Sequence, residues 1–188
     1  MPQIVNSSGF LLVPKSQREL VVSKTAGVVG EIFTAALDHL GTPNTMRAIS
    51  HVLGEHYGTS SVLLFGLKTD SSLQLVESFG FSVSIQEKFV SVSLFDALPV
   101  PDSIRERKIA RFSAAELFEK YPNLLGLSLP HEVFYVVPCT SSGLPLGGLI
   151  VGFFTVKNGE ELPNMVLQAL QVAAFHVLSR QTDLVEVI

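Results

Sequence analysis

Two apolar runs near the C-terminal end of the chain constrain its fold more than any other feature. The first is VFYVVPC at residues 133–139, the second is LGGLIVGFFTV at residues 146–156, and TSSGLP lies between them. A strand with one face in water alternates apolar and polar residues, whereas a nearly continuous apolar run is typical of a strand buried on both faces. We therefore expect a hairpin with other elements packed on both sides. Pro138 should lie at a strand end or bulge, because proline cannot donate to the ladder.

Long apolar helices at the two ends of the chain can cover such a hairpin. Residues 16–40 carry two parallel apolar stripes at helical spacing. The first stripe is Val22, Ala26, Val29, Phe33, Ala36 and Leu40, and the second is Val21, Thr25, Val28, Ile32 and Ala35. The last helix, expected from after Gly159 to about Arg180, is apolar nearly all round. In residues 16–40 one stripe can face the core, and the second is explained either by a partner helix or by a single wide buried face. The pattern of the last helix fits a helix that packs on both sides.

Between these helices, turn residues separate several short elements. Gly41 is placed to end the first helix, and Thr42-Pro43 predicts the start of a second helix that runs to about Tyr57. Three β-type segments follow, at residues 61–67, 73–79 and 88–94.

The next segment, residues 95–122, is irregular. We expect a short helix from about Asp102 and a brief strand at residues 109–112. Ser113 and Glu116 match a capping box, in which each side chain satisfies a free backbone amide of the other residue, and they predict a short helix that ends near Tyr121.

Composition limits the class of protein. The chain has 188 residues, of which 47% are hydrophobic and 16% charged, so it is long and apolar enough for one folded domain. The net charge is −4 and the densest basic patch is RERKIAR at residues 105–111, so we expect no direct binding to nucleic acid. No apolar stretch approaches the roughly 20 residues that cross a bilayer, so we expect no membrane contact.

The single cysteine and the five histidines give little evidence of cofactor chemistry. Cys139 alone cannot form an internal disulfide or a multi-cysteine metal site, which favours a reducing cytoplasm. It is either a redox sensor or an inert buried thiol, and the absence of His, Lys or Arg within three residues favours the inert thiol. Among the histidines, His51 and His56 are five residues apart, an unfavourable spacing for one metal on a helix. We considered haem ligation by a histidine, but the sequence implies no metal or covalent cofactor.

The order helix, helix, three strands, irregular segment, two strands, helix resembles the GAF domain, a family of small-molecule sensors. SSVLLFGLKTDSSLQLVESFGF is similar to the opening hairpin of the family. DSIRERKIARFSAAELFEKYPNL is similar to its connecting helix, short strand and "yP" segment. VFYVVPCTSSGLPLGGLIVGFF is similar to its last hairpin. The resemblance implies an α+β fold, with a profilin-like antiparallel sheet of five to six strands. The terminal helices would cover one face and the irregular segment the other.

The resemblance also implies a domain division and a site. Residues 16–181 would form the GAF-like domain, residues 1–15 an N-terminal arm, and residues 182–188 a tail or the start of a linker helix. A ligand pocket would lie under the irregular segment. The residues that the resemblance places there are Ser91, Ser93, Phe95, Ile104, Arg105, Phe112, Tyr135 and Cys139.

The sequence departs from three specialised branches of the family. The motif of members that bind cyclic nucleotides is not present. Bilin-binding members attach pigment to a cysteine that is commonly followed by histidine, whereas Cys139 is followed by Thr140. Free methionine sulfoxide reductases use several cysteines.

The resemblance therefore implies a non-enzymatic cytoplasmic sensor of an unknown small molecule. We expect a homodimer through residues 16–40 and 160–181, with regulation of transcription as the output. The alternatives are a dimerisation module with a vestigial pocket and, third, a small redox enzyme of the sulfoxide-reductase type.

Overall fold

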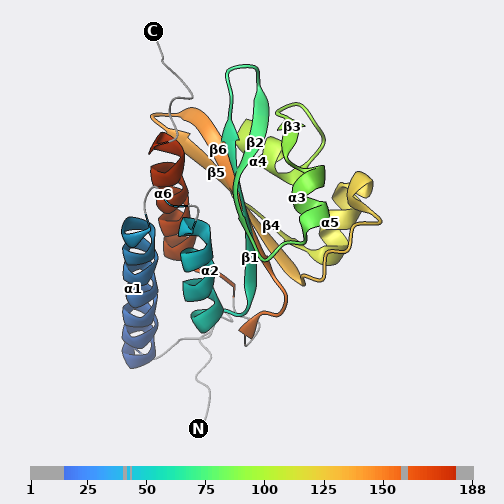
Figure 1. Ribbon diagram of the computed structural model, residues 1–188. Helices are drawn as coiled ribbons and strands as arrows, with labels where there is room; N and C mark the ends of the chain where they lie inside the picture. Colours follow the sequence, from blue (N-terminus) through green and yellow to red (C-terminus); the bar gives the residue numbers. More distant parts are fainter. Residues whose placement is uncertain (1–14, 40–41, 43, 158–160, 181–188) are drawn as a thin grey trace, which may run out of the picture.

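One antiparallel sheet lies between two groups of helices in the computed structural model, which describes residues 15–39, 42, 44–157 and 161–180 (Figure 1). The strands follow the order β3-β2-β1-β6-β5-β4, so the two shortest, β3 and β4, form the edges. They are β1 (Ser60–Leu67), β2 (Ser72–Phe79), β3 (Ser91–Ser93), β4 (Ala110–Ser113), β5 (Val133–Ser141) and β6 (Leu144–Phe153). The predicted α+β class is confirmed, and so is the antiparallel sheet, whose six strands fall within the predicted five to six.

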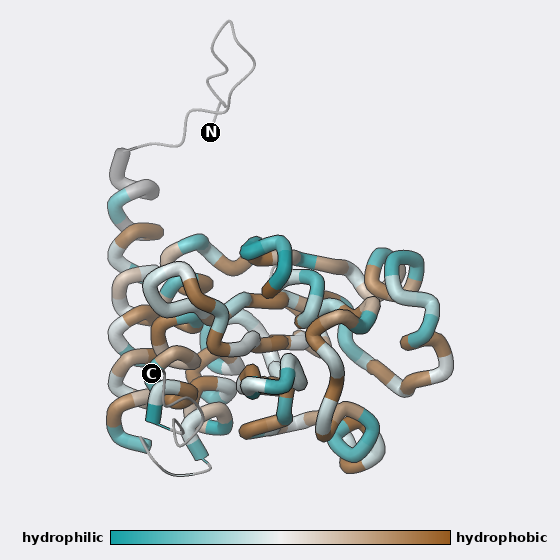
Figure 2. Tube along the Cα trace, turned by 90° about the horizontal axis from the view of Figure 1, so that it is seen from above, coloured by the Kyte–Doolittle hydropathy of each residue, from teal (hydrophilic) through white to brown (hydrophobic). Residues whose placement is uncertain are grey.

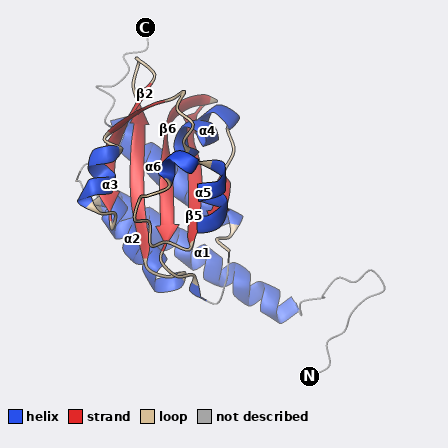
Figure 3. Cartoon of the chain, turned by 90° about the vertical axis from the view of Figure 1, so that its right-hand side faces the viewer, coloured by secondary structure: helices blue, strands red, loops and turns tan. Residues whose placement is uncertain are grey.

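The helices divide between the two faces of the sheet. Helices α1 (Lys15–Asp38), α2 (Thr45–His56) and α6 (Asn164–Arg180) cover one face. Helices α3 (Val83–Lys88), α4 (Pro99–Glu106) and α5 (Ala114–Lys120) lie over the other, with a 3₁₀ turn, η1 (Pro122–Leu124). Figure 3 looks onto this second face, with the three short helices in front of the strands. The expected separation of the terminal helices from the irregular segment is therefore confirmed.

The sheet separates two apolar cores. Val62 and Leu149 pack with α1, α2 and α6, whereas their neighbours Leu63 and Ile150 face the short helices. Successive residues of a strand point to opposite faces, so an apolar run supplies both cores at once. This arrangement confirms that the last hairpin is buried on both sides. The pairing register between β5 and β6 shifts between Cys139 and Thr140. Pro138 therefore lies next to an irregularity of the ladder, in line with the strand end or bulge expected for it.

Helix α1 buries its second apolar stripe more deeply than its first. The buried residues are Thr25, Val28, Ile32 and Ala36, mainly from the second stripe, while Val22 of the first is 61% exposed. Figures 2 and 3 show that the N-terminal turns of α1 extend beyond the rest of the domain. In the first stripe, Val22 and Ala26 are exposed, whereas Val29 and Phe33 are partly buried and pack against the same core as the second stripe. The single wide buried face considered from the sequence therefore describes the middle of α1 and not its N-terminal turns. None of the helices in the described ranges is both long and apolar enough to span a bilayer.

Helix α2 begins later than the sequence predicts. Its first residue is Thr45 and its N-cap is Asn44, so Thr42 is not the cap. The buried Glu77 on β2 accepts a hydrogen bond of 2.9 Å from the Met46 backbone amide. A strand carboxylate thus satisfies one of the free amides at the start of this helix. The other residues proposed for this boundary, Gly41 and Pro43, lie outside the described residues, as do residues 1–14 and 181–188.

Two further boundaries differ from expectation. Instead of a strand over residues 88–94, the chain forms helix α3 and a strand of three residues. Gln86 holds α3 to the end of β2, because it accepts a hydrogen bond from Ser78 and donates one to the Phe81 carbonyl. Helix α4 begins at Pro99, three residues before the expected start at Asp102. A first helical turn tolerates prolines, because the backbone amides that they lack would have no partner within the helix.

Candidate functional site

An apolar cavity of about 60 Å³ lies between the sheet and the short helices. Strands β1, β5 and β6 form its floor, and α3, α4, α5 and the loop after η1 form its cover. Every lining residue is apolar. They are Leu63, Phe65, Phe81, Ile85, Phe89, Val92, Leu98, Pro99, Val100, Pro101, Leu117, Leu124, Leu127, Leu129, Phe134, Val136 and Ile150. This is the face of the sheet on which the pocket was expected.

A glycine in β6 brings the cover close to the floor. A Cβ atom at Gly148 would lie 2.7 Å from Cγ1 of Val100, so α4 packs directly on the strand backbone. Val100 and the prolines beside it, Pro99 and Pro101, line the cavity. Because Gly148 has no side chain, α4 can pack at this short distance from the sheet.

Polar contacts on the outer side of the cover tie its parts together. Asp102 pairs with Arg105, which also donates to the Leu94 carbonyl in the loop after β3. The Tyr121 hydroxyl donates a hydrogen bond of 3.0 Å to Asp102, and Lys120 Nζ lies 3.9 Å from the same carboxylate. Burial and the adjacent Asp102 raise the pKa of Tyr121, so its hydroxyl keeps its proton. These contacts join α4, α5 and the β3–α4 loop above the cavity.

A buried histidine lies beside the cavity. His131 precedes β5 and is 3% exposed. Its ring centroid lies 4.8 Å from that of Phe81, 5.2 Å from that of Phe134 and 4.3 Å from that of Phe154. Burial lowers the pKa of His131 to about 4, so the imidazole is neutral at pH 7. Neither ring nitrogen has a hydrogen-bond partner among the described residues.

None of the eight site residues expected from the sequence lines the cavity. Ile104 and Phe112 are buried in the core around it, and Arg105 belongs to the outer contacts of the cover. Ser91 and Ser93 lie in edge strand β3, and Phe95, in the loop after it, is 74% exposed.

Tyr135 and Cys139 lie on the opposite face of the sheet, in the core with α1, α2 and α6. The Tyr135 hydroxyl accepts a hydrogen bond of 3.0 Å from the Leu162 amide. Cys139 is fully buried, and burial raises the pKa of its thiol to about 12, as expected of an inert thiol. A ligand-binding role for the eight residues stays a prediction to which the cavity geometry lends no support.

The sequence reasoning missed the residues that do line the cavity. Phe134, Val136 and Ile150 alternate with residues that face the long helices, and this period-two pattern was the available signal. The continuous apolar run hid this pattern, because no polar residue shows which alternate residues face the cavity and which face the long helices.

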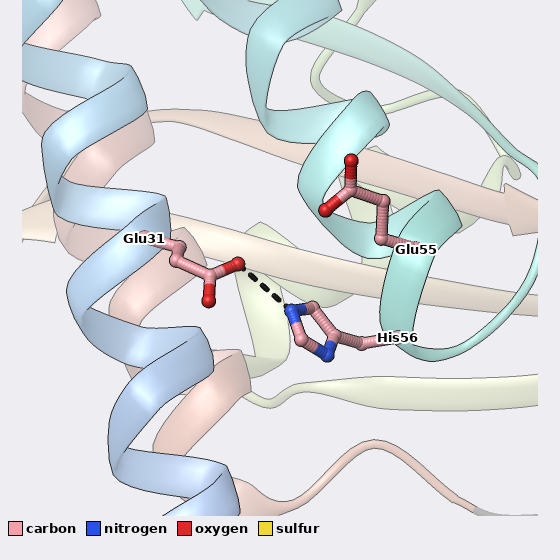
Figure 4. Close-up of side chains that lie close together, drawn as sticks. All are labelled: Glu31, Glu55 and His56. Atoms are coloured by element: carbon pink, nitrogen blue, oxygen red, sulfur yellow. Dashed lines mark hydrogen bonds and ion pairs between the residues drawn. The ribbon is translucent and has the colours of Figure 1, made fainter.

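A second cluster of polar side chains lies between α1 and α2 (Figure 4). Glu31, Glu55 and His56 have potential ligand atoms within 4.8 Å of one another. His56 Nε2 and Glu31 Oε2 are 2.8 Å apart and already pair with each other, and both glutamates are exposed. The arrangement is that of a polar contact between two helices. It does not use the His51 and His56 pair considered from the sequence.

Comparison with known proteins finds similarity in structure and none in sequence. No protein-family model matches the chain, and no curated protein matches it in sequence. The GAF domain of an Acinetobacter phosphoenolpyruvate-protein phosphotransferase is similar over 84% of this chain and 94% of its own, with a TM-score of 0.63 and 14% identity. A GAF domain of the same kind of protein from Coxiella burnetii is similar over 82% and 90%, with a TM-score of 0.58 and 14% identity.

An enzyme shares the same architecture. The free methionine-R-sulfoxide reductase of Neisseria meningitidis, solved with its substrate, is similar over 95% of each chain, with a TM-score of 0.59 and 16% identity. Identities this low establish a fold and leave the activity to the site, because one fold hosts many functions. By its fold, the chain is a GAF-like domain.

Proposed function

We propose that the chain is a non-enzymatic regulatory domain that binds a small molecule in the cavity under α3, α4 and α5. The cavity carries the proposal. Protein interiors are close-packed, and a void of about 60 Å³ with a wholly apolar lining exceeds the space of one water molecule. The cover above it is held by short helices and a few side-chain contacts, so it can adjust to an occupant.

Strands β5 and β6 can transmit a change at the cavity to the helices on the opposite face of the sheet. Val136 lines the cavity, and Val137 next to it packs in the core with α6. Gln171 of α6 donates a hydrogen bond of 2.6 Å to the Pro138 carbonyl of β5. A ligand that binds one arrangement of these strands more tightly would shift the population of the whole unit toward it.

The output surface that we propose is a homodimer formed by α1 and α6. The two helices contact each other, as Figure 1 shows, and each carries large apolar side chains that are exposed. The exposed fractions are 60% for Val21, 61% for Val22, 62% for Leu37, 49% for Met165 and 40% for Val172. A second copy would cover this surface. Cytoplasmic regulation of transcription is the output we favour, by resemblance to regulators that carry GAF domains.

The enzyme in the same fold class is the main competing function. A sulfoxide reductase needs a reactive thiol at its substrate. Cys139 is the single cysteine of the chain, lies on the face opposite the cavity and has a raised pKa. These three properties favour the regulatory function over the redox one.

A thermal-shift screen with a library of small apolar and amphiphilic compounds tests the proposal. A ligand that binds the folded chain raises the melting temperature by mass action. We expect hits whose effect is lost in Val136→Phe, which fills the cavity, and kept in Val83→Phe, a control in which an exposed residue of α3 changes. If no compound shifts the melting temperature, the domain is a dimerisation module with a vestigial pocket. Turnover of free methionine sulfoxide that Cys139→Ser abolishes would establish the enzyme instead.

A further inference from the structure

Three buried side-chain atoms in the described part of the chain have no hydrogen-bond partner. They are Oγ of Ser61 and both ring nitrogens of His131. Both residues are at least 97% buried, since Ser61 is 0% and His131 3% exposed. Buried polar groups are almost always paired with protein or ordered water, and each exception calls for an explanation. Two such residues in one domain raise the question of whether they share a partner.

The two residues lie on the same face of the sheet. Ser61 of β1 is directly opposite Gly152 of β6, and Phe134 of β5 is opposite Gly152 on its other side. A Cβ atom on Gly152 would lie 2.8 Å from Cδ2 of His131, so the imidazole packs on this glycine. Directly opposite residues share a face of the sheet. Ser61 and His131 therefore lie on the same face of the sheet and close together, His131 over Gly152 and the Ser61 hydroxyl beside Gly80, where a Cβ atom would lie 2.5 Å from Oγ.

This place borders the cavity. Phe81 and Phe134 contact the His131 ring and also line the cavity. Leu63 lies two residues from Ser61 on the same face of β1 and lines the cavity as well. A molecule that fills the cavity and moves either ring slightly would bring a polar group to His131 and Ser61.

The surroundings decide the charge of such a molecule. No lysine or arginine lines the cavity, and His131 has the lowered pKa of a buried neutral imidazole. A buried anion would have no opposite charge, which is strongly unfavourable in an apolar interior. A neutral imidazole offers one donor and one acceptor, and a hydroxyl offers one donor and two acceptor lone pairs, which suits an uncharged hydroxyl or carbonyl group.

We propose that Ser61 and His131 bind the hydroxyl or carbonyl group of a small uncharged ligand whose apolar body occupies the cavity. The inference rests on the proposed function, since it names the chemical class of the ligand. The cavity volume of about 60 Å³ restricts the apolar body to a few carbon atoms. The competing explanation is a trapped water that satisfies both side chains and never exchanges with a ligand.

A matched pair of probes tests this class. Pentane has a methyl group where 1-butanol has its hydroxyl, so the two differ in hydrogen bonding at nearly the same shape. Dissociation constants for both come from NMR titrations of the methyl signals of Val136 and Ile150. We expect the preference for 1-butanol over pentane to fall about tenfold in Ser61→Ala and in His131→Leu, the effect of losing one hydrogen bond of ordinary strength.

The variants and the control are chosen to stay folded. Each variant removes an unpartnered polar group, so neither is expected to destabilise the empty domain. Cys139→Ala changes a buried residue on the opposite face and should keep the wild-type preference. The imidazole ¹⁵N signals of His131 should shift on saturation with 1-butanol and not with pentane.

Two results would overturn the inference. If both variants keep the wild-type preference while both probes bind, the cavity is a functional site and the polar pair holds only water. If neither probe binds, this ligand class is wrong, and the compound screen described above decides separately whether the cavity binds anything.

Discussion

At the scale of single residues, His131 links folding to pH. Its pKa of about 4 in the folded chain lies below the ordinary value of 6.5. Between these two values the unfolded chain binds the proton more readily, so protonation favours unfolding. The stability that depends on neutral His131 is therefore fully present above about pH 6.5 and is lost progressively as the pH falls toward 4.

We predict that His131→Leu removes much of this acid sensitivity. The free energy of unfolding of the wild type should fall by up to about 3 kcal/mol between pH 7 and pH 4 through this residue. Urea denaturation at several pH values measures the slope for the wild type and the variant. His176→Gln, at an exposed histidine, is the control and should keep the wild-type slope. An identical slope in His131→Leu would contradict the assignment.

Glu77 supports a second prediction at this scale. Burial raises its pKa, and the hydrogen bond from the Met46 amide lowers it, with burial the larger effect. Glu77→Gln keeps an acceptor for Met46 without a buried charge, so the stability at pH 7 should stay the same or rise. Glu77→Ala leaves the helix amide unpartnered and should lower the free energy of unfolding by about 1–2 kcal/mol. Equal losses in the two variants, measured by urea denaturation, would show that the helix start does not need the acceptor.

At the scale of elements, close contact between β6 and β1 depends on a glycine. A Cβ atom at Gly147 would lie 1.9 Å from the Phe65 carbonyl oxygen, a backbone atom that cannot move aside. We predict that Gly147→Ala lowers the free energy of unfolding by more than about 2 kcal/mol. Gly30→Ala is the matched control, because nothing lies within 4 Å of that position in α1. It should raise stability by about 0.5–1 kcal/mol. Chemical denaturation compares the two, and similar effects would refute this packing.

A helix or hairpin is predictable from sequence when the contacts that fix it lie within its own segment of the chain. The capping box is present, because Ser113 and Glu116 bond to each other's backbone amides and need no distant partner. The last hairpin was also predicted, since its turn and apolar runs lie within one short segment. Helix α3 was missed, because its fixing contacts, such as that between Ser78 and Gln86, join separate elements. The site residues failed for a similar reason: a strand with both faces buried gives no sign of which residues face the cavity, and Tyr135 lies on the far side.

At the scale of the whole molecule, substitutions in α1 and α6 test the proposed homodimer. We predict that the wild type elutes and scatters light as a dimer, and that Val22→Glu combined with Val172→Glu yields a folded monomer. Charges at these exposed positions leave the core unchanged but cannot be buried in an apolar contact. Val83→Glu is the control, since Val83 is 68% exposed on the opposite face and should not affect the dimer. A wild type that remains monomeric at high concentration contradicts the proposed output surface.

The two margins of the sheet give the molecule a further property. Strand β3 has three residues and strand β4 has four, so each edge strand itself offers few backbone groups to an incoming strand from another chain. Margins this short guard against the run-on stacking of sheets that leads to fibrils, a hazard for chains with long apolar strands in their centre. Growth of an assembly by strand addition is thereby discouraged, which leaves the helical surface that we propose as the place for association.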